Sequence, residues 1–314
     1  MALGLHSLCY QKGLPLLLHE KRGSLRVIEM NKNQKIRMMR KILLGAVVAI
    51  GAMMGMTGCK MVSGGGSSDS LLTDSVKFQQ ADSLLSCVVS ADVPTGTDSM
   101  AIGVRTFINA MLDSMSLATA FSGTPGPAYS GDLTDGQAMV RYYGQQGADS
   151  LRAMDHTYTM APYSYTASVR KVADTPRYVT YSTESYSFLG GAHGSAMSFT
   201  YNILKPSGRV LTATVDTAQV MKMQPLLAQG VADYISVQGQ KVTAKEVLGL
   251  LFIDNGIIPL PKCTPYLTPT GLCFIYQQYE IGPYAMGMIT FTLPYGKVKP
   301  YMTPEALRLV GDAQ

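Results

Sequence analysis

A histidine set among three glycines is the residue best placed for acid/base chemistry or ligand contact. The segment 188–194 reads Phe-Leu-Gly-Gly-Ala-His-Gly and contains Gly190, Gly191, His193 and Gly194. Glycines adopt positive φ angles and let the backbone approach another group closely, so this segment is predicted to turn tightly between strands or to form a binding surface. In the first case His193 only satisfies backbone carbonyls, and in the second its imidazole meets a ligand.

A second segment, 276–287, gathers tyrosines around one acid. It reads Tyr-Gln-Gln-Tyr-Glu-Ile-Gly-Pro-Tyr-Ala-Met-Gly and includes Tyr279, Glu280 and Tyr284. We interpret Glu280 first as a buried carboxylate that accepts backbone N–H groups where a strand turns. The alternative is a tyrosine-rich recognition patch, because tyrosine offers a large contact area at low entropic cost.

The rest of the chain supplies no recognised catalytic or metal-binding motif. Beyond Cys59 there are two histidines, His156 and His193, and neither belongs to an H-x-x-E-H or H-E-x-x-H spacing for zinc. A G-x-S-x-G nucleophile elbow is also absent. We therefore expect no catalytic residue, no metal and no cofactor. The alternative is an envelope glycan hydrolase in which His193 and Glu280 meet within hydrogen-bond reach as an acid/base pair.

An export signal ends at Cys59. A basic stretch at 32–41, an apolar run at 42–56 and small residues before the cysteine form the parts of such a signal. The apolar run is too short and too rich in glycine and alanine to favour a membrane-spanning helix. The pattern predicts a bacterial lipoprotein signal over 30–58, with lipid attached at Cys59.

The residues on either side of this signal have separate interpretations. Residues 1–29 contain two acids ahead of the signal and are predicted to be a spurious extension of the gene start. Residues 59–75 include a Gly/Ser-rich stretch and are predicted to form the lipid anchor and a flexible tether. The default location is the outer membrane facing the periplasm, with exposure on the cell surface left open.

The leader distorts the overall charge. The chain has 26 Lys and Arg and 21 Asp and Glu, but nine of the basic and two of the acidic residues lie within 1–59. Residues 60–314 therefore carry 17 basic and 19 acidic side chains, a formal charge of −2. A nearly neutral chain without a Lys/Arg cluster has no electrostatic footprint for nucleic acid, so we expect no nucleic-acid partner.

Three cysteines lie beyond the leader. Cys263 and Cys273 flank a stretch with proline and glycine that is able to turn back on itself, so a disulfide and two thiols are both open. Cys87 lies in an apolar run and is predicted to be a buried thiol.

Hydrophobic periodicity divides the remainder into helices and strands. Helical spacing predicts helices over 98–115, 135–154 and 217–235, a capping box at Thr243 and Glu246, and a helix start at Thr303 and Pro304. Alternation predicts strands over 84–89, 163–189, 196–204, 272–279 and 288–293. Grouped helices and hairpin-linked strands indicate an α+β fold, an antiparallel sheet with helices packed on it.

The two unusual segments, together with Leu293-Pro294-Tyr295, resemble the extracytoplasmic domain at the C-terminal end of the anti-sigma factor RsiV. The resemblance covers about 76–298. It implies an α+β domain over 76–314, with an N-terminal half at about 76–160 and a more specific half at about 161–300. In RsiV this domain binds lysozyme, and similar domains accompany some peptidoglycan deacetylases and occur in envelope lipoproteins. The resemblance does not identify which residues of this chain would contact lysozyme.

The chain also departs from RsiV. RsiV has a transmembrane helix and a cytoplasmic sigma-binding segment that this sequence does not match, so signalling through a sigma factor is not implied. We expect a lipid-anchored envelope protein that binds a lysozyme-like protein or peptidoglycan without catalysis. The alternatives are the hydrolase and a structural envelope lipoprotein.

Overall fold

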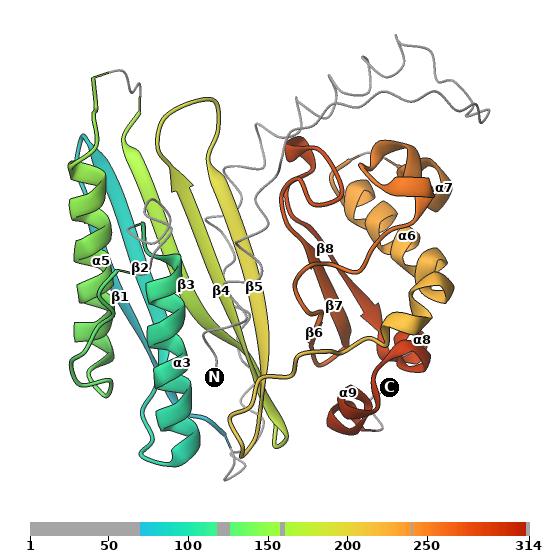
Figure 1. Cartoon of the computed structure of the whole chain (residues 1–314), viewed down its shortest axis with the longest axis horizontal. Coiled ribbons are helices and arrows are strands. Elements are labelled where there is room, and N and C mark those ends of the chain that lie inside the picture. Colours follow the sequence, from blue (N-terminus) through green and yellow to red (C-terminus); the bar gives the residue numbers. More distant parts are fainter. Residues whose placement is uncertain (1–69, 118–125, 158–160, 240, 312–314) are drawn as a thin grey trace.

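The computed structural model describes residues 70–117, 126–157, 161–239 and 241–311 (Figure 1). The predicted extension 1–29, the signal segment 30–58 and Cys59 lie outside the described residues. Within the described part, no helix has both the length and the apolar character needed to cross a membrane.

Five strands form the first sheet, in the order β1-β2-β3-β4-β5. They are β1 (Thr73–Ala81), β2 (Leu85–Pro94), β3 (Tyr163–Asp174), β4 (Tyr178–Phe188) and β5 (Ser195–Leu204). Helices α3 (Ser99–Met115) and α5 (Gly136–Arg152) connect β2 to β3 and cover one face of this sheet (Figure 1). The side chains of Asp98 and Asp135 accept N–H groups of the first turns, which fixes where both helices begin.

The second half contains a smaller sheet and most of the short helices. Its strands, in the order β6-β7-β8, are β6 (Tyr266–Leu267), β7 (Gly271–Tyr276) and β8 (Ile289–Pro294). Its α-helices are α6 (Val220–Val237), α7 (Ala244–Val247), α8 (Tyr295–Val298) and α9 (Pro304–Val310). Its 3-10 turns are η1 (Thr217–Gln219), η2 (Leu248–Leu250), η3 (Asp254–Gly256), η4 (Tyr284–Met286) and η5 (Lys299–Tyr301). The capping box at Thr243 and Glu246 and the N-cap at Thr303 are confirmed.

The α+β class is confirmed, and three details of the expected sheet are wrong. There are two sheets, and β2 pairs with β3 in parallel because the crossover through α3 and α5 returns the chain in the same direction. Strand β1 takes in residues 73–75, which the sequence assigned to the tether. Strand β7 ends at Tyr276, because the N–H of Gln277 donates to the Glu280 carboxylate instead of continuing the ladder.

Side-chain amides join the two halves along β5. The amide of Gln277 accepts from Ser198 N at 3.0 Å and donates to Ser198 O at 2.6 Å, as a neighbouring strand would. The side-chain oxygen of Asn202, a residue only 1% exposed, accepts from Leu267 N at 3.0 Å. These contacts pair the edge of the large sheet with the β6–β7 side of the small one.

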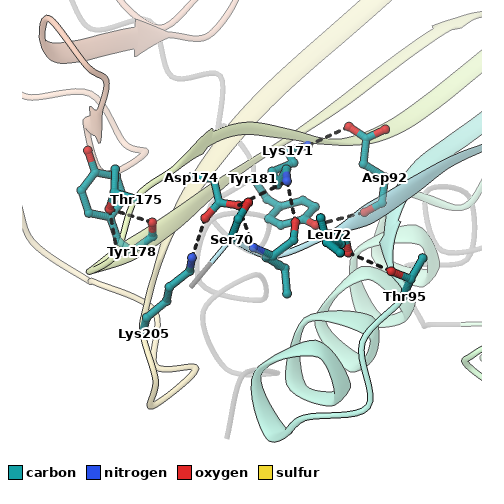
Figure 2. A network of polar contacts seen from close by, with 11 residues as sticks. Ser70, Leu72, Asp92, Thr95, Lys171, Asp174, Thr175, Tyr178, Tyr181 and Lys205 are labelled. Carbon is teal, nitrogen blue, oxygen red and sulfur yellow. Dashed lines mark hydrogen bonds and ion pairs between the residues drawn. The ribbon is translucent and has the colours of Figure 1, made fainter. Parts of the chain in front are cut away.

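A largely buried ionic cluster holds the start of the described chain against the large sheet (Figure 2). The Asp174 carboxylate accepts from Leu71 N at 2.9 Å and from Lys205 Nζ at 2.5 Å. Lys171 Nζ lies 3.3 Å from the same carboxylate and donates to Leu71 O at 2.6 Å. We call this group, which also includes Ser70, the N-terminal latch. It fixes the point at which the chain enters the domain.

Candidate functional site

The glycine–histidine segment forms the connection between β4 and β5. Gly190 and Gly191 have φ angles of 85° and 93°, a region that side-chain-bearing residues rarely adopt. The positive φ angles predicted for this segment are therefore present at two of its three glycines. His193 follows them on the surface, and its Nδ1 donates to Gly194 O at 2.9 Å. That hydrogen bond leaves Nε2 as an acceptor directed away from the turn.

The tyrosine-rich corner after β7 meets this histidine. The hydroxyl of Tyr279 lies 3.5 Å from His193 Nε2, a long hydrogen bond in which Tyr279 is the donor. The ring of Tyr284 stacks on the imidazole with a centroid distance of 3.9 Å, and its hydroxyl donates to Gly194 O at 2.8 Å. The structure therefore brings together two segments that lie 86 residues apart in the sequence.

Tyr186 completes the group and was not identified from the sequence. A Cβ on Gly194 would collide with the Tyr186 ring, so this glycine makes room for the tyrosine. Tyr186 is 38% exposed and Tyr279 is 58% exposed. We call Tyr186, His193, Tyr279 and Tyr284 the aromatic cluster. It presents ring surface and hydroxyl groups and contains no carboxylate or ammonium group.

Tyr279 has a backbone conformation that residues with a side chain rarely adopt. Its φ angle is 64°, a left-handed conformation that is unfavourable for a residue with a Cβ. Within the described chain, Asn255 is the other non-glycine residue with positive φ. Strained residues persist where the surrounding structure holds them, often at binding sites. The most exposed tyrosine of the aromatic cluster is thus held in place at an energetic cost.

Glu280 has a different environment from its neighbour. Its carboxylate accepts from Lys262 N at 2.6 Å and from Gln277 N at 2.7 Å. Desolvation raises the pKa of Glu280, and the two backbone N–H groups and the charge of Lys262 act in the opposite direction. Among the described residues, no hydrogen bond links Glu280 to His193. These contacts agree with the first interpretation of Glu280, a carboxylate that accepts backbone N–H groups at a turn. They connect the turn after β7 to the segment before β6.

The pH dependence of stability tests this role of Glu280. Because its pKa in the folded state is raised above the ordinary 4.5, the folded protein binds this proton more tightly than the unfolded chain does. The contribution of Glu280 to the free energy of unfolding therefore falls as pH rises from about 4.5 through the folded pKa. We compare the free energies of unfolding of the wild type and Glu280→Gln by urea titration. The advantage of the wild type is expected to be largest at low pH. A difference that grows in favour of the wild type as pH rises would contradict a raised pKa.

The three cysteines of the described residues are free thiols. Cys263 and Cys273 are not joined by a disulfide, so the second of the two alternatives applies to this structure. Cys263 accepts a weak hydrogen bond from Gln277 Nε2 at 3.6 Å. Cys87 is fully buried, as predicted, and burial raises its pKa to about 12. Such a thiol is a core residue and is unreactive at neutral pH.

Two cavities lie elsewhere on the described part of the chain, and that part holds no cluster of metal-ligating side chains. Across the described ranges, no group of three or more His, Cys, Asp and Glu residues is arranged to hold a metal ion. One cavity of about 430 Å³ lies between the β3–β4 turn and the end of α9. Another of about 570 Å³ lies between α6 and β8. Neither of these two cavities is lined by a residue of the aromatic cluster.

Comparisons with known proteins support the fold and name no activity. A family described as proteins of unknown function, DUF3298, matches residues 259–296, which include the tyrosine-rich corner. A solved DUF3298 protein from Pseudomonas aeruginosa PAO1 is similar at 12% identity, with a TM-score of 0.50 over 74% of this chain and 94% of that one. A DUF3298 member from Bacteroides fragilis NCTC 9343 is similar at 17% identity, with a TM-score of 0.50 over 74% and 93%. No curated protein matches this chain.

Proposed function

We propose that this chain is a non-catalytic binding protein of the cell envelope, anchored by lipid at Cys59, whose RsiV-like domain recognises its ligand through the aromatic cluster. The observation that supports the proposal most is the cluster itself, which exposes Tyr279 at a strained backbone position beside His193. Exposed tyrosines on a rigid support are typical of recognition surfaces. Glu280, which follows Tyr279 in the sequence, is engaged by backbone N–H groups and forms none of the hydrogen bonds described for His193.

The position of the aromatic cluster suits a tethered binding domain. Strand β4 begins at Tyr178, next to Val179, which pairs with Asp174 of the N-terminal latch, and it ends at Phe188, directly before the glycine–histidine turn. Its 11 residues span roughly 35 Å at about 3.3 Å per residue. A tether that enters at Ser70 therefore leaves the aromatic cluster at the opposite end of the sheet. In this arrangement the ligand approaches the end of the domain that points away from the membrane.

Two ligands deserve direct tests. A lysozyme-like protein is the first, because the RsiV-like resemblance implies it and because tyrosines dominate protein recognition surfaces. A peptidoglycan fragment is the second, since exposed tyrosine rings also stack against the faces of sugars. Calorimetric titration of the full chain in detergent micelles with each ligand is the measurement. An absence of heat of binding with both would remove the two ligands named here.

The substitution Tyr279→Gly is expected to weaken ligand binding without lowering the stability of the fold. Glycine adopts the φ angle of 64° without strain, so we expect the free energy of unfolding to rise by up to about 1 kcal/mol. Loss of the ring removes the most exposed tyrosine of the aromatic cluster, and we expect affinity for the ligand to fall at least about 30-fold, which corresponds to roughly 2 kcal/mol. Chemical unfolding and calorimetric titration measure the two effects on the same preparation.

The matched control is Tyr142→Ala on α5. Tyr142 likewise has a hydroxyl that forms a hydrogen bond, to Pro127 O at 2.7 Å, but it lies on the helix-covered side of the large sheet and outside the aromatic cluster. We expect this variant to lose some stability and to bind the ligand with unchanged affinity. Equal losses of affinity in both variants, or unchanged affinity in Tyr279→Gly, would argue against recognition through the aromatic cluster.

A further inference from the structure

The outer edge of β8 is open. Strand β8 is the last strand of the small sheet, and its opposite edge pairs with β7. The cavity between α6 and β8 is lined by Phe291 and Leu293, whose side chains face the core, and also by Thr290 and Thr292, which face outward. No residue of β7 lines this cavity, so it lies along the side of β8 that pairs with no described strand. Backbone N–H and C=O groups on this edge are therefore accessible.

This edge is unprotected in a way that the other edges are not. The edge of β5 is covered by the side-chain amides of Gln277 and Gln278, which pair with Ser198 and Ala196. Strand β1, at the other end of the large sheet, carries Asp74 and Lys77. Strand β8 reads Ile-Thr-Phe-Thr-Leu-Pro and contains no charged residue. Proteins usually place charges, prolines, bulges or covering segments on exposed strand edges, and β8 has a proline only at its last position, so the edge over 289–293 is available to pair with another strand.

Two unpaired charges lie at opposite ends of this edge. Helix α6 runs antiparallel to β8, because Gly230 packs against Phe291 while Tyr234, farther along α6, donates to Met286 O ahead of the strand. Asp233 therefore lines the cavity near the beginning of β8, and Lys297 lines it just beyond the end. Neither forms an ion pair with another described residue. An acid at one end and a base at the other are complementary to the same edge turned through 180°.

We propose that β8 pairs antiparallel with β8 of a second copy of this chain, about a twofold axis near Thr292. Pairing joins the two small sheets into one continuous sheet across the dimer. The axis brings Lys297 of each copy beside Asp233 of the other, so the two ion pairs form together. The dimer leaves the aromatic cluster of each copy untouched and does not depend on the ligand proposed above.

A charge exchange tests the pairing. We expect sedimentation equilibrium of the full chain in detergent micelles to show a dimer, and either Asp233→Lys or Lys297→Asp alone to weaken dimerisation at least about 10-fold because like charges then meet twice. The double variant restores opposite charges at both contacts and is expected to return the dimer dissociation constant to within about 3-fold of the wild type. Circular dichroism verifies that each variant is folded.

The chain provides a matched control for the helix substitution. On α5, Gln145 donates to Asp149 at 2.8 Å, the same i to i+4 contact that Gln229 makes with Asp233 at 2.7 Å on α6. Asp149→Lys therefore makes the same local change far from β8 and is expected to leave dimerisation unaltered. A monomeric wild type overturns the proposal, as do single variants that dimerise normally or a double variant that does not recover.

Discussion

Replacement of Asp174 by alanine is expected to lower the free energy of unfolding by about 3 to 5 kcal/mol, the usual cost of removing one partner from a buried ionic group. The side chains of Asp174, Lys171 and Lys205 are only 15%, 10% and 9% exposed. One carboxylate thus compensates two nearly buried ammonium groups and also accepts the N–H of Leu71 (Figure 2). Without it, the two positive charges face each other in a site from which water is largely excluded. Urea unfolding at neutral pH measures the loss.

The exposed ion pair between Arg152 and Asp82 is the control. Their side chains are 49% and 39% exposed, and the atoms lie 2.7 Å apart. Because water screens such a pair, Arg152→Ala is expected to cost less than about 1 kcal/mol. Similar losses for Arg152→Ala and Asp174→Ala would show that burial does not set the strength of the N-terminal latch. Limited proteolysis adds a local readout, since release of Leu71 in Asp174→Ala exposes the start of β1 to cleavage.

The positions of the helices could be predicted from the sequence because the residues that cap a helix lie next to it in the chain. Asp98 caps the predicted helix at 98–115, and Thr243 with Glu246 forms the expected capping box. Strand β1 escaped prediction because it is an edge strand whose side chains are mostly exposed or half-buried, so it lacks an alternating hydrophobic pattern. The parallel pairing of β2 with β3 depends on how a crossover of two helices returns to the sheet, which no periodicity records.

The candidate site was predictable in its parts and not in its assembly. The positive φ angles of Gly190 and Gly191 were foreseeable from residue type, and so was the engagement of Glu280 by backbone N–H groups. The contact between His193 and Tyr279 requires the two halves to meet along β5, where Asn202, Gln277 and Gln278 form hydrogen bonds between them. We call this contact the seam, and no local sequence pattern specifies it. Tyr186 gave no signal, because it is one of three tyrosines on β4, and only the missing side chain of Gly194 marks its position.

The seam that assembles the aromatic cluster is expected to depend most on Asn202. Its side-chain oxygen accepts from Leu267 N in the small sheet and from Thr180 Oγ1, at 3.1 Å, in the large one. Asn202→Ala leaves a buried N–H group of β6 without an acceptor and opens a small cavity between the sheets. We expect the free energy of unfolding to fall by about 2 to 4 kcal/mol, the sum of a lost buried hydrogen bond and the cavity.

The same type of contact in a more exposed position gives the matched comparison. The side-chain oxygen of Gln278 accepts from Ala196 N at 3.0 Å, but Gln278 is only half-buried, so water is able to replace the amide in Gln278→Ala. A loss below about 1 kcal/mol is expected there. If Asn202→Ala costs no more than Gln278→Ala, the buried amide does not hold the halves together. If it costs more, ligand affinity should also fall in Asn202→Ala, because His193 and Tyr279 reach each other only across this seam.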